Sequence, residues 1–247
     1  MKELNITKKQ YEIISYLCRF RFLNSKQIMR FMKHKDNSLI NIWLSDLVKK
    51  GIIGRIYSKE LGKGNTPAVY YLATANKTVA DHLNIKQASL DYVYKEKLRS
   101  EQFRARQMIL ADMNLDLIEE VAGGKGKLAF FTKVDLIPHK YLIHPLPDVY
   151  IALRKGRKVK RYFVEVIDPK YPVFAIKNKV QNYIKYFQSK EFEDITSHPF
   201  PAVLIICQNE PIKSRFMKCI TKQRDTDYLE GLSFYVRSTL DTSWEKV

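Results

Sequence analysis

The chain has 247 residues, of which 45% are apolar, 12% aromatic and 28% charged. This composition supports packed cores and excludes a disordered or low-complexity protein, and the length predicts two domains of ordinary size. The formal net charge is +17, from 43 Lys and Arg against 26 Asp and Glu. Because each phosphate that a basic side chain neutralises releases counterions, the expected partner is a polyanion, with a merely solvated basic surface as the alternative.

Cysteine usage and hydropathy narrow the class of protein further. Cys18, Cys207 and Cys219 stand far apart and outside any Cys-x-x-Cys pair, which favours neither a disulfide framework nor a zinc site. The amino-terminal segment has no apolar signal core, and no run reaches the roughly 18 apolar residues of a membrane helix. We therefore expect a cytoplasmic protein without a membrane partner.

The first third of the chain predicts three helices and a hairpin. Thr7 caps a run with apolar residues at helical spacing, Asn24 or Ser25 caps a shorter run, and the third run ends at Gly51. Two alternating apolar runs then flank the basic, Gly-rich tip LGKGNTP. This order of elements is typical of a winged helix-turn-helix domain, which we expect over residues 1–75.

In a winged helix the third helix enters the major groove and the wing follows the DNA backbone. The expected DNA contacts are Lys35, Asn37, Ser38, Asn41 and Ser45 at the third helix, and Arg55, Lys59, Lys63 and Asn65 in the wing. Asn41 is the best candidate for base reading, because an Asn amide can pair with an adenine edge. For each position, an ordinary solvated surface residue is the alternative.

Winged helices also dock proteins, so the element order alone does not establish DNA binding. Between Lys26 and Lys63 nine Lys or Arg stand against three acidic residues, and this excess favours double-stranded DNA as the partner. Residues 76–100 have helical spacing without a deep apolar stripe. This segment predicts a helical connector between the two domains. It could also be a dimerisation helix, in which case the protein would be a homodimer.

Residues 101–247 predict an α/β domain. A long amphipathic helix over 101–121 is followed by three strands, a helix, an apolar strand, a helix and a last strand. The apolar side of the long helix is expected to hold Phe103, Met108, Leu110, Met113, Leu117 and Ile118. Six basic residues surround the turn between the second and third strands. They predict either a second phosphate-binding surface or an ordinary solvated hairpin tip.

The strand order, with Pro147-Asp148 opening the second strand and Glu165 near the end of the third, resembles the PD-(D/E)xK restriction-endonuclease-like core. That resemblance implies that Asp148 and Glu165 hold Mg²⁺ while a lysine orients the attacking water. Ile167 occupies the position of the motif lysine here, so the lysine would have to come from the next helix, as Lys177 or Lys179. The alternative to metal binding is that Asp148 is a turn residue after Pro147 and that Glu165 is an edge-facing charge paired with a nearby Lys or Arg.

Asp168, which precedes Pro169, either adds a ligand for the metal or begins a turn.

Segments along most of the chain resemble the replication-relaxation family of plasmids and mobile elements. They are RFLNSKQI, VYYLAT, LPDVYIAL, RYFVEVID, KNKVQNYIKYF and FPAVLIIC. The resemblance covers most of the chain. It implies a DNA-binding protein that acts at an origin, together with replication or mobilisation proteins.

Three functions follow as hypotheses. The first is a DNA-binding protein of replication or mobilisation without nuclease activity and without a certain cofactor. The second is a Mg²⁺-dependent endonuclease or nickase that uses Asp148, Glu165 and a helix lysine. The third is a transcriptional regulator of a mobile element, with the second domain as sensor or dimeriser.

Overall fold

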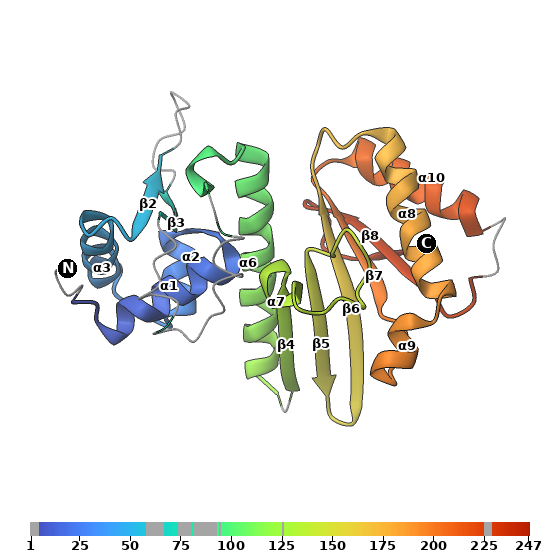
Figure 1. Ribbon diagram of the computed structural model, residues 1–247, viewed down its shortest axis with the longest axis horizontal. Coiled ribbons are helices and arrows are strands. Elements are labelled where there is room, and N and C mark those ends of the chain that lie inside the picture. Colours follow the sequence, from blue (N-terminus) through green and yellow to red (C-terminus); the bar gives the residue numbers. More distant parts are fainter. Residues whose placement is uncertain are drawn as a thin grey trace. The chain divides into compact units, whose positions relative to one another are not determined.

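The computed structural model describes residues 5–57, 67–73, 81, 93, 95–124, 126–224 and 229–247. Contacts divide the chain into a first unit, residues 1–117, and a second unit, residues 118–247, and each is described separately (Figure 1). Among the described residues, no helix has the length and apolar character needed to span a membrane.

Three helices of the first unit form where the sequence predicts them. They are α1 (Lys8–Phe20), α2 (Ser25–Phe31) and α3 (Asn37–Lys49). Thr7 and Asn24 cap the first two with capping boxes, in which the N3 glutamine side chain returns the bond to the cap backbone. After α3, Gly51 takes a positive φ of 70°, which a residue without Cβ adopts freely.

A small antiparallel sheet completes the first unit. Its strands are β1 (Phe22–Asn24), β2 (Ile53–Ile56) and β3 (Val69–Leu72), in the order β1-β3-β2. A Cβ at Gly54 would lie 2.2 Å from the Tyr71 ring, so the glycine allows that ring to cross the sheet. Three helices and this sheet form a winged helix, as predicted.

The long helix α6 (Glu101–Ala122) lies mostly in the first unit. Gln27 of α2 donates to the Met108 carbonyl at 3.0 Å and to Asp112 at 2.8 Å, and Arg30 pairs with Asp116 at 2.9 Å. The division between the units therefore falls after Leu117, whereas the sequence places a domain boundary at residue 101. Of the connector expected over 76–100, only Asp81, Val93 and residues 95–100 lie within the described part, including the short 3₁₀ helix η1 (Glu96–Leu98).

The helix α6 keeps the six residues predicted on or near its apolar side at least partly buried. Its buried residues are Leu110, Ala111, Asn114 and Leu115. Of the six residues expected there, only Leu110 is buried, and the other five are partly exposed. Partial burial on several sides of one helix blurs the apolar periodicity from which the prediction was made.

The second unit is built on a six-stranded mixed sheet in the order β4-β5-β6-β7-β8-β9. The strands are β4 (Gly126–Thr132), β5 (Val149–Lys155), β6 (Lys158–Ile167), β7 (Ala202–Cys207), β8 (Phe234–Ser238) and β9 (Glu245–Lys246). The strands β6, β7 and β8 are parallel, and the other pairs are antiparallel. The second unit is thus an α/β domain, as the sequence predicts.

Two helices, α8 (Val173–Gln188) and α10 (Glu210–Arg224), pack with the sheet around one hydrophobic core (Figure 1). Phe163, Ile167 and Ile205 of the strands meet Val180 and Phe216 of the helices there. Two short helices, α7 (Lys133–Leu136) and α9 (Glu191–Thr196), are also present. The first of the three strands expected after the long helix ends at Thr132, where the chain turns into α7, because Asp135 accepts bonds from the Thr132 backbone and hydroxyl and so starts a helical turn.

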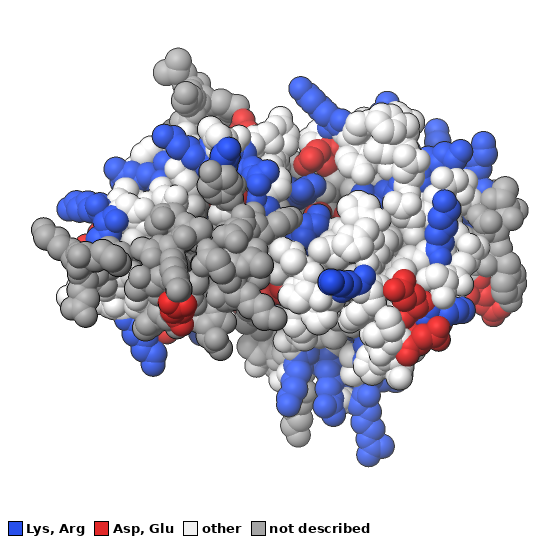
Figure 2. Space-filling model, viewed as in Figure 1, with Lys and Arg blue, Asp and Glu red and all other residues white. Residues whose placement is uncertain are grey.

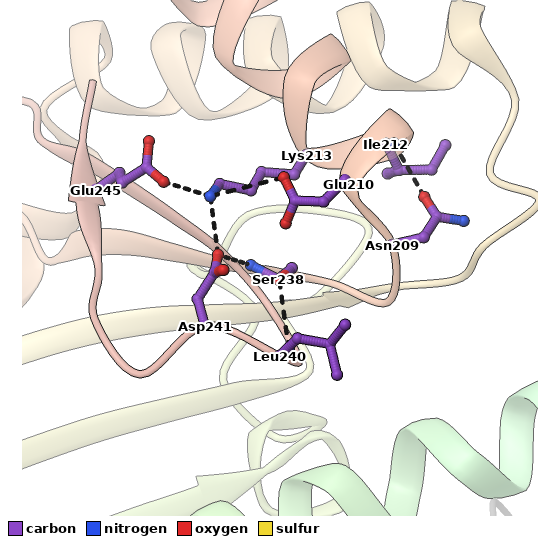
Figure 3. A network of polar contacts seen from close by, with 8 residues as sticks. All are labelled: Asn209, Glu210, Ile212, Lys213, Ser238, Leu240, Asp241 and Glu245. Carbon is purple, nitrogen blue, oxygen red and sulfur yellow. Dashed lines mark hydrogen bonds and ion pairs between the residues drawn. The ribbon is translucent and has the colours of Figure 1, made fainter.

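Lys213 of α10 fastens the C-terminal hairpin to the domain (Figure 3). Its Nζ lies 2.8 Å from Oδ2 of Asp241 and 3.9 Å from Oε2 of Glu210, and it also contacts Glu245 of β9. Hydrogen bonds to Asp241 and Glu245 raise the pKa of Lys213, and the same bond from Lys213 lowers the pKa of Asp241 to about 2.

This cluster predicts a specific pH dependence of stability. The pKa of Asp241 is depressed on folding, so its contribution is complete above its ordinary value of about 3.9 and is lost as the pH falls towards 2. We expect Lys213→Met to lower the urea midpoint most at neutral pH, with the difference from wild type shrinking as the pH falls below about 4. Trp244 fluorescence in a Trp43→Phe background would follow the transition, with the exposed Lys218→Met as control. Parallel pH profiles for wild type and Lys213→Met would contradict the prediction.

Candidate functional site

The outward face of α3 carries the predicted base-reading residues. Lys35, Asn37, Ser38 and Asn41 are exposed and Ser45 is half-buried, while Ile40, Leu44 and Leu47 are buried on the opposite side. Within the described part of the chain, the Asn41 and Ser45 side chains make no hydrogen bond. Their donors and acceptors are therefore open to a ligand.

Two further residues of this face were missed. Ile42 is 60% exposed beside Asn41, and Lys49 is exposed two turns further along α3. An exposed isoleucine can contact a thymine methyl group, and a lysine a phosphate. The signal for Lys49 was its helical spacing from Asn41 and Ser45, at i+8 and i+4, whereas the spacing gave none for Ile42.

The wing is described only in part. Arg55 of β2 is exposed, and its guanidinium lies 5.3 Å from the centre of the Tyr57 ring. The other predicted wing contacts, Lys59, Lys63 and Asn65, lie outside the described residues.

The two candidate carboxylates come together in the second unit. Asp148 immediately precedes β5, and Glu165 lies on β6; each is only 3% exposed. The Asp148 backbone N–H donates to the Val164 carbonyl at 3.0 Å, and its Oδ2 accepts from the Val166 N–H at 2.9 Å. Asp148 is thus bonded to both neighbours of Glu165 in the chain.

Each carboxylate is paired with a lysine. Lys179 of α8 lies 2.8 Å from Oε2 of Glu165, and Lys133 of α7 lies 3.2 Å from Oδ1 of Asp148. Burial lowers the pKa of Lys179, but the charge and hydrogen bond of Glu165, with a contribution from Asp148, outweigh burial and leave that pKa raised. Lys179 is therefore a cation in this site.

A tyrosine completes the surroundings of Glu165. The Tyr183 hydroxyl donates to Oε1 of Glu165 at 2.9 Å, and burial, together with the nearby Glu165 charge, raises the pKa of Tyr183 well above its usual value. Neither Tyr183 nor Lys133 was predicted. Tyr183 follows Lys179 by four residues, one turn of α8, which was the available signal.

The structure distinguishes the two candidate helix lysines. Lys177 is exposed and lowers the pKa of the Cys219 thiol on α10, against the larger effect of burial, so it lies near α10 and away from Glu165. Two residues along a helix rotate a side chain by about 200°, which separates Lys177 from Lys179. Asp168 begins a turn closed by the Tyr171 N–H at 3.1 Å, as one of its two interpretations expected.

The donor set can be tested for a resident Mg²⁺. All four oxygens of Asp148 and Glu165 accept from protein donors, and two lysine charges balance the two carboxylates. Among the described residues, no group of three His, Cys, Asp or Glu side chains could hold a metal ion. Mg²⁺ would therefore have to displace Lys133 or Lys179 from these oxygens before it could bind them.

A cavity of about 170 Å³ opens beside this ion pair. Its lining includes Glu165, Lys179 and Tyr183 together with Asn178 and Asn182 of α8. Because Glu165 and Lys179 both line it, water or a small ligand in this cavity would lie beside the pair.

Fold and site together define a protein with a winged-helix first unit and an α/β second unit, in which two buried carboxylates are each paired with a lysine. A family model described as replication-relaxation matches residues 15–201. The chain therefore belongs to the replication-relaxation family. No curated protein matches it.

Solved structures with partial likeness include the PcaV transcriptional regulator from Streptomyces coelicolor, at 19% identity and a TM-score of 0.29, over 50% of this chain and 79% of that one. The restriction endonuclease FokI matches at 13% identity and a TM-score of 0.36, over 96% of this chain and 44% of that one.

Proposed function

We propose that this protein binds double-stranded DNA through its winged helix and acts at an origin, in replication or mobilisation of a plasmid or mobile element, without cutting the DNA. The outward face of α3 carries the proposal, because Asn41 and Ser45 are open to a ligand there. An exposed lysine stands at each end of the helix, Lys35 just before it and Lys49 at its last position. Membership of the replication-relaxation family supports the role at an origin.

The second unit supports a non-catalytic role. Its carboxylates are satisfied by protein donors and balanced by lysines, which leaves no charge for a metal to neutralise. One observation favours the alternative, a Mg²⁺-dependent nuclease. Lys179 lies beside Glu165, where a lysine displaced from the position of Ile167 would have to lie.

Base reading by α3 is tested with Asn41→Ala. After selection of a binding site from random duplexes, we expect this change to weaken binding to the selected site by roughly 5- to 150-fold, the cost of one bidentate base contact. Binding to an unrelated duplex should change little, because phosphate contacts remain. Fluorescence anisotropy measures both affinities. Asn178→Ala on α8, another exposed asparagine, is the control, and equal effects of the two substitutions would contradict the assignment.

The absence of cutting is tested on supercoiled plasmid with Mg²⁺ or Mn²⁺. We expect retarded but uncut DNA with wild type, Asp148→Ala and Glu165→Ala alike. Metal-dependent nicking by wild type that both substitutions abolish would replace the proposal by the nuclease alternative. Footprints confined to the promoter of its own gene, with none at an origin, would favour the transcriptional regulator.

A further inference from the structure

A basic hairpin projects from the second unit at the turn between β5 and β6. We define it by its six basic residues: Arg154, Lys155, Arg157, Lys158, Lys160 and Arg161. The first five are exposed, and Arg161 is half-buried. Figure 2 shows Lys and Arg side chains projecting at the foot of the view, where Figure 1 places this turn.

Few of these charges have a partner within the protein. Lys155 pairs with Glu120, and the Arg154 side chain donates to the Gly156 carbonyl at 3.0 Å. In the residues that the structure describes, the side chains of Arg157, Lys158 and Lys160 have no hydrogen bond or ion pair. Three neighbouring cations are thus left to solvent or to a ligand.

The strand register places like charges against each other. Lys155 pairs directly with Lys158 across the hairpin, next to Arg154 and Arg157. Like charges directly opposite each other on two strands destabilise the pairing. A polyanion would remove this repulsion, so its binding gains energy that an isolated basic side chain would not provide.

A simpler explanation of the basic residues is that they protect a sheet edge from aggregation, but this explanation applies to only part of the hairpin. β6 pairs with β7 only from Tyr162 onwards, so Lys158 and Lys160 lie on an open edge, where charges prevent aggregation. Arg154 and Lys155 lie on β5, which is paired on one side with β4 and on the other with β6. Edge protection therefore does not explain the charges of Arg154 and Lys155.

The hairpin is also separate from the carboxylate pair. β5 begins next to Asp148 and ends at the hairpin, and its seven residues span about 23 Å at 3.3 Å per residue. A ligand at the basic hairpin therefore does not require the pocket beside Glu165.

We propose that the basic hairpin is a second DNA contact, which binds the phosphates of duplex DNA without reading the sequence. A two-stranded ribbon of this width fits the major groove, and rows of Lys and Arg match its phosphate edges. The inference rests on the proposed function, since it adds a contact to the same partner.

Salt dependence of binding by the full chain tests the inference. The triple variant Arg157→Gln, Lys158→Gln and Lys160→Gln removes only charges without an internal partner. The slope of log K against log salt should become less steep by about 0.9 for each phosphate that the variant no longer neutralises, so by up to about 2.7. We expect the same decrease on the selected site and on an unrelated duplex, measured by fluorescence anisotropy over roughly 50 to 200 mM salt.

The matched control removes three exposed lysines from the helices of the same unit, with Lys177, Lys218 and Lys222 changed to Gln. An unchanged slope in the hairpin variant, or an equal decrease in the control, would overturn the inference while the proposed function stands. A wild-type protein that binds no duplex at all would overturn the proposed function and this inference together.

Discussion

Glu96→Leu is expected to destabilise the first unit by about 3–5 kcal/mol, because it leaves the buried charge of Arg21 without its carboxylate. Both side chains are at most 5% exposed, and Nη2 of Arg21 lies 2.5 Å from Oε1 of Glu96. The Arg21 guanidinium also lies 4.6 Å from the centre of the Phe103 ring, so it is held in place when the carboxylate is removed. This pair connects η1 to the end of α1 across 75 positions of sequence.

Trp43 reports this unit alone once Trp244 is replaced by Phe, and urea unfolding of that background measures the loss. Glu101→Leu, at an exposed position of α6, is the control and should change stability little. The double variant Arg21→Met, Glu96→Leu should regain most of the loss, since it removes both charges. A loss below about 1 kcal/mol in Glu96→Leu would show that the pair is not the buried contact described here.

The second large effect concerns the carboxylate pair. Lys179→Met is expected to destabilise the second unit by about 3–5 kcal/mol, because the Glu165 carboxylate stays buried without its cation. Side-chain exposures of 13% for Lys179 and 4% for Glu165 place the pair well inside the domain. Lys177→Met, on the same helix but exposed, should have almost no effect.

Mg²⁺ gives this prediction a second measurement. With Lys179 in place, we expect millimolar Mg²⁺ to leave the urea midpoint of wild type unchanged, because the carboxylates are already balanced. In Lys179→Met the negative charge of Glu165 has lost its lysine partner. Mg²⁺ should then raise the urea midpoint of this variant, since a ligand that binds only the folded state stabilises it. Trp244 fluorescence in the Trp43→Phe background measures both. A midpoint that rises with Mg²⁺ in wild type would contradict our assignment of the site and strengthen the nuclease alternative.

The sequence by itself determined the elements with strong local signals. Thr7, Asn24 and Gly51 mark helix ends through contacts within a few residues, and the apolar spacing of α3 identified its buried face. The apolar runs of β5 and β6 likewise identified two strands with Asp148 and Glu165 near their ends, although the register that brings the two carboxylates together came from the structure. Such signals are readable because the interacting groups are close in sequence.

Only the tertiary structure decided what the functional side chains contact. Lys179 rather than Lys177 meets Glu165, Lys133 meets Asp148, and Glu96 covers Arg21. These partners are separated by 14, 15 and 75 positions. A local pattern shows which face of an element is apolar, but the partner of a buried charge depends on which elements pack together. That packing brings a cation to each carboxylate of the pair, and the sequence alone could not show it.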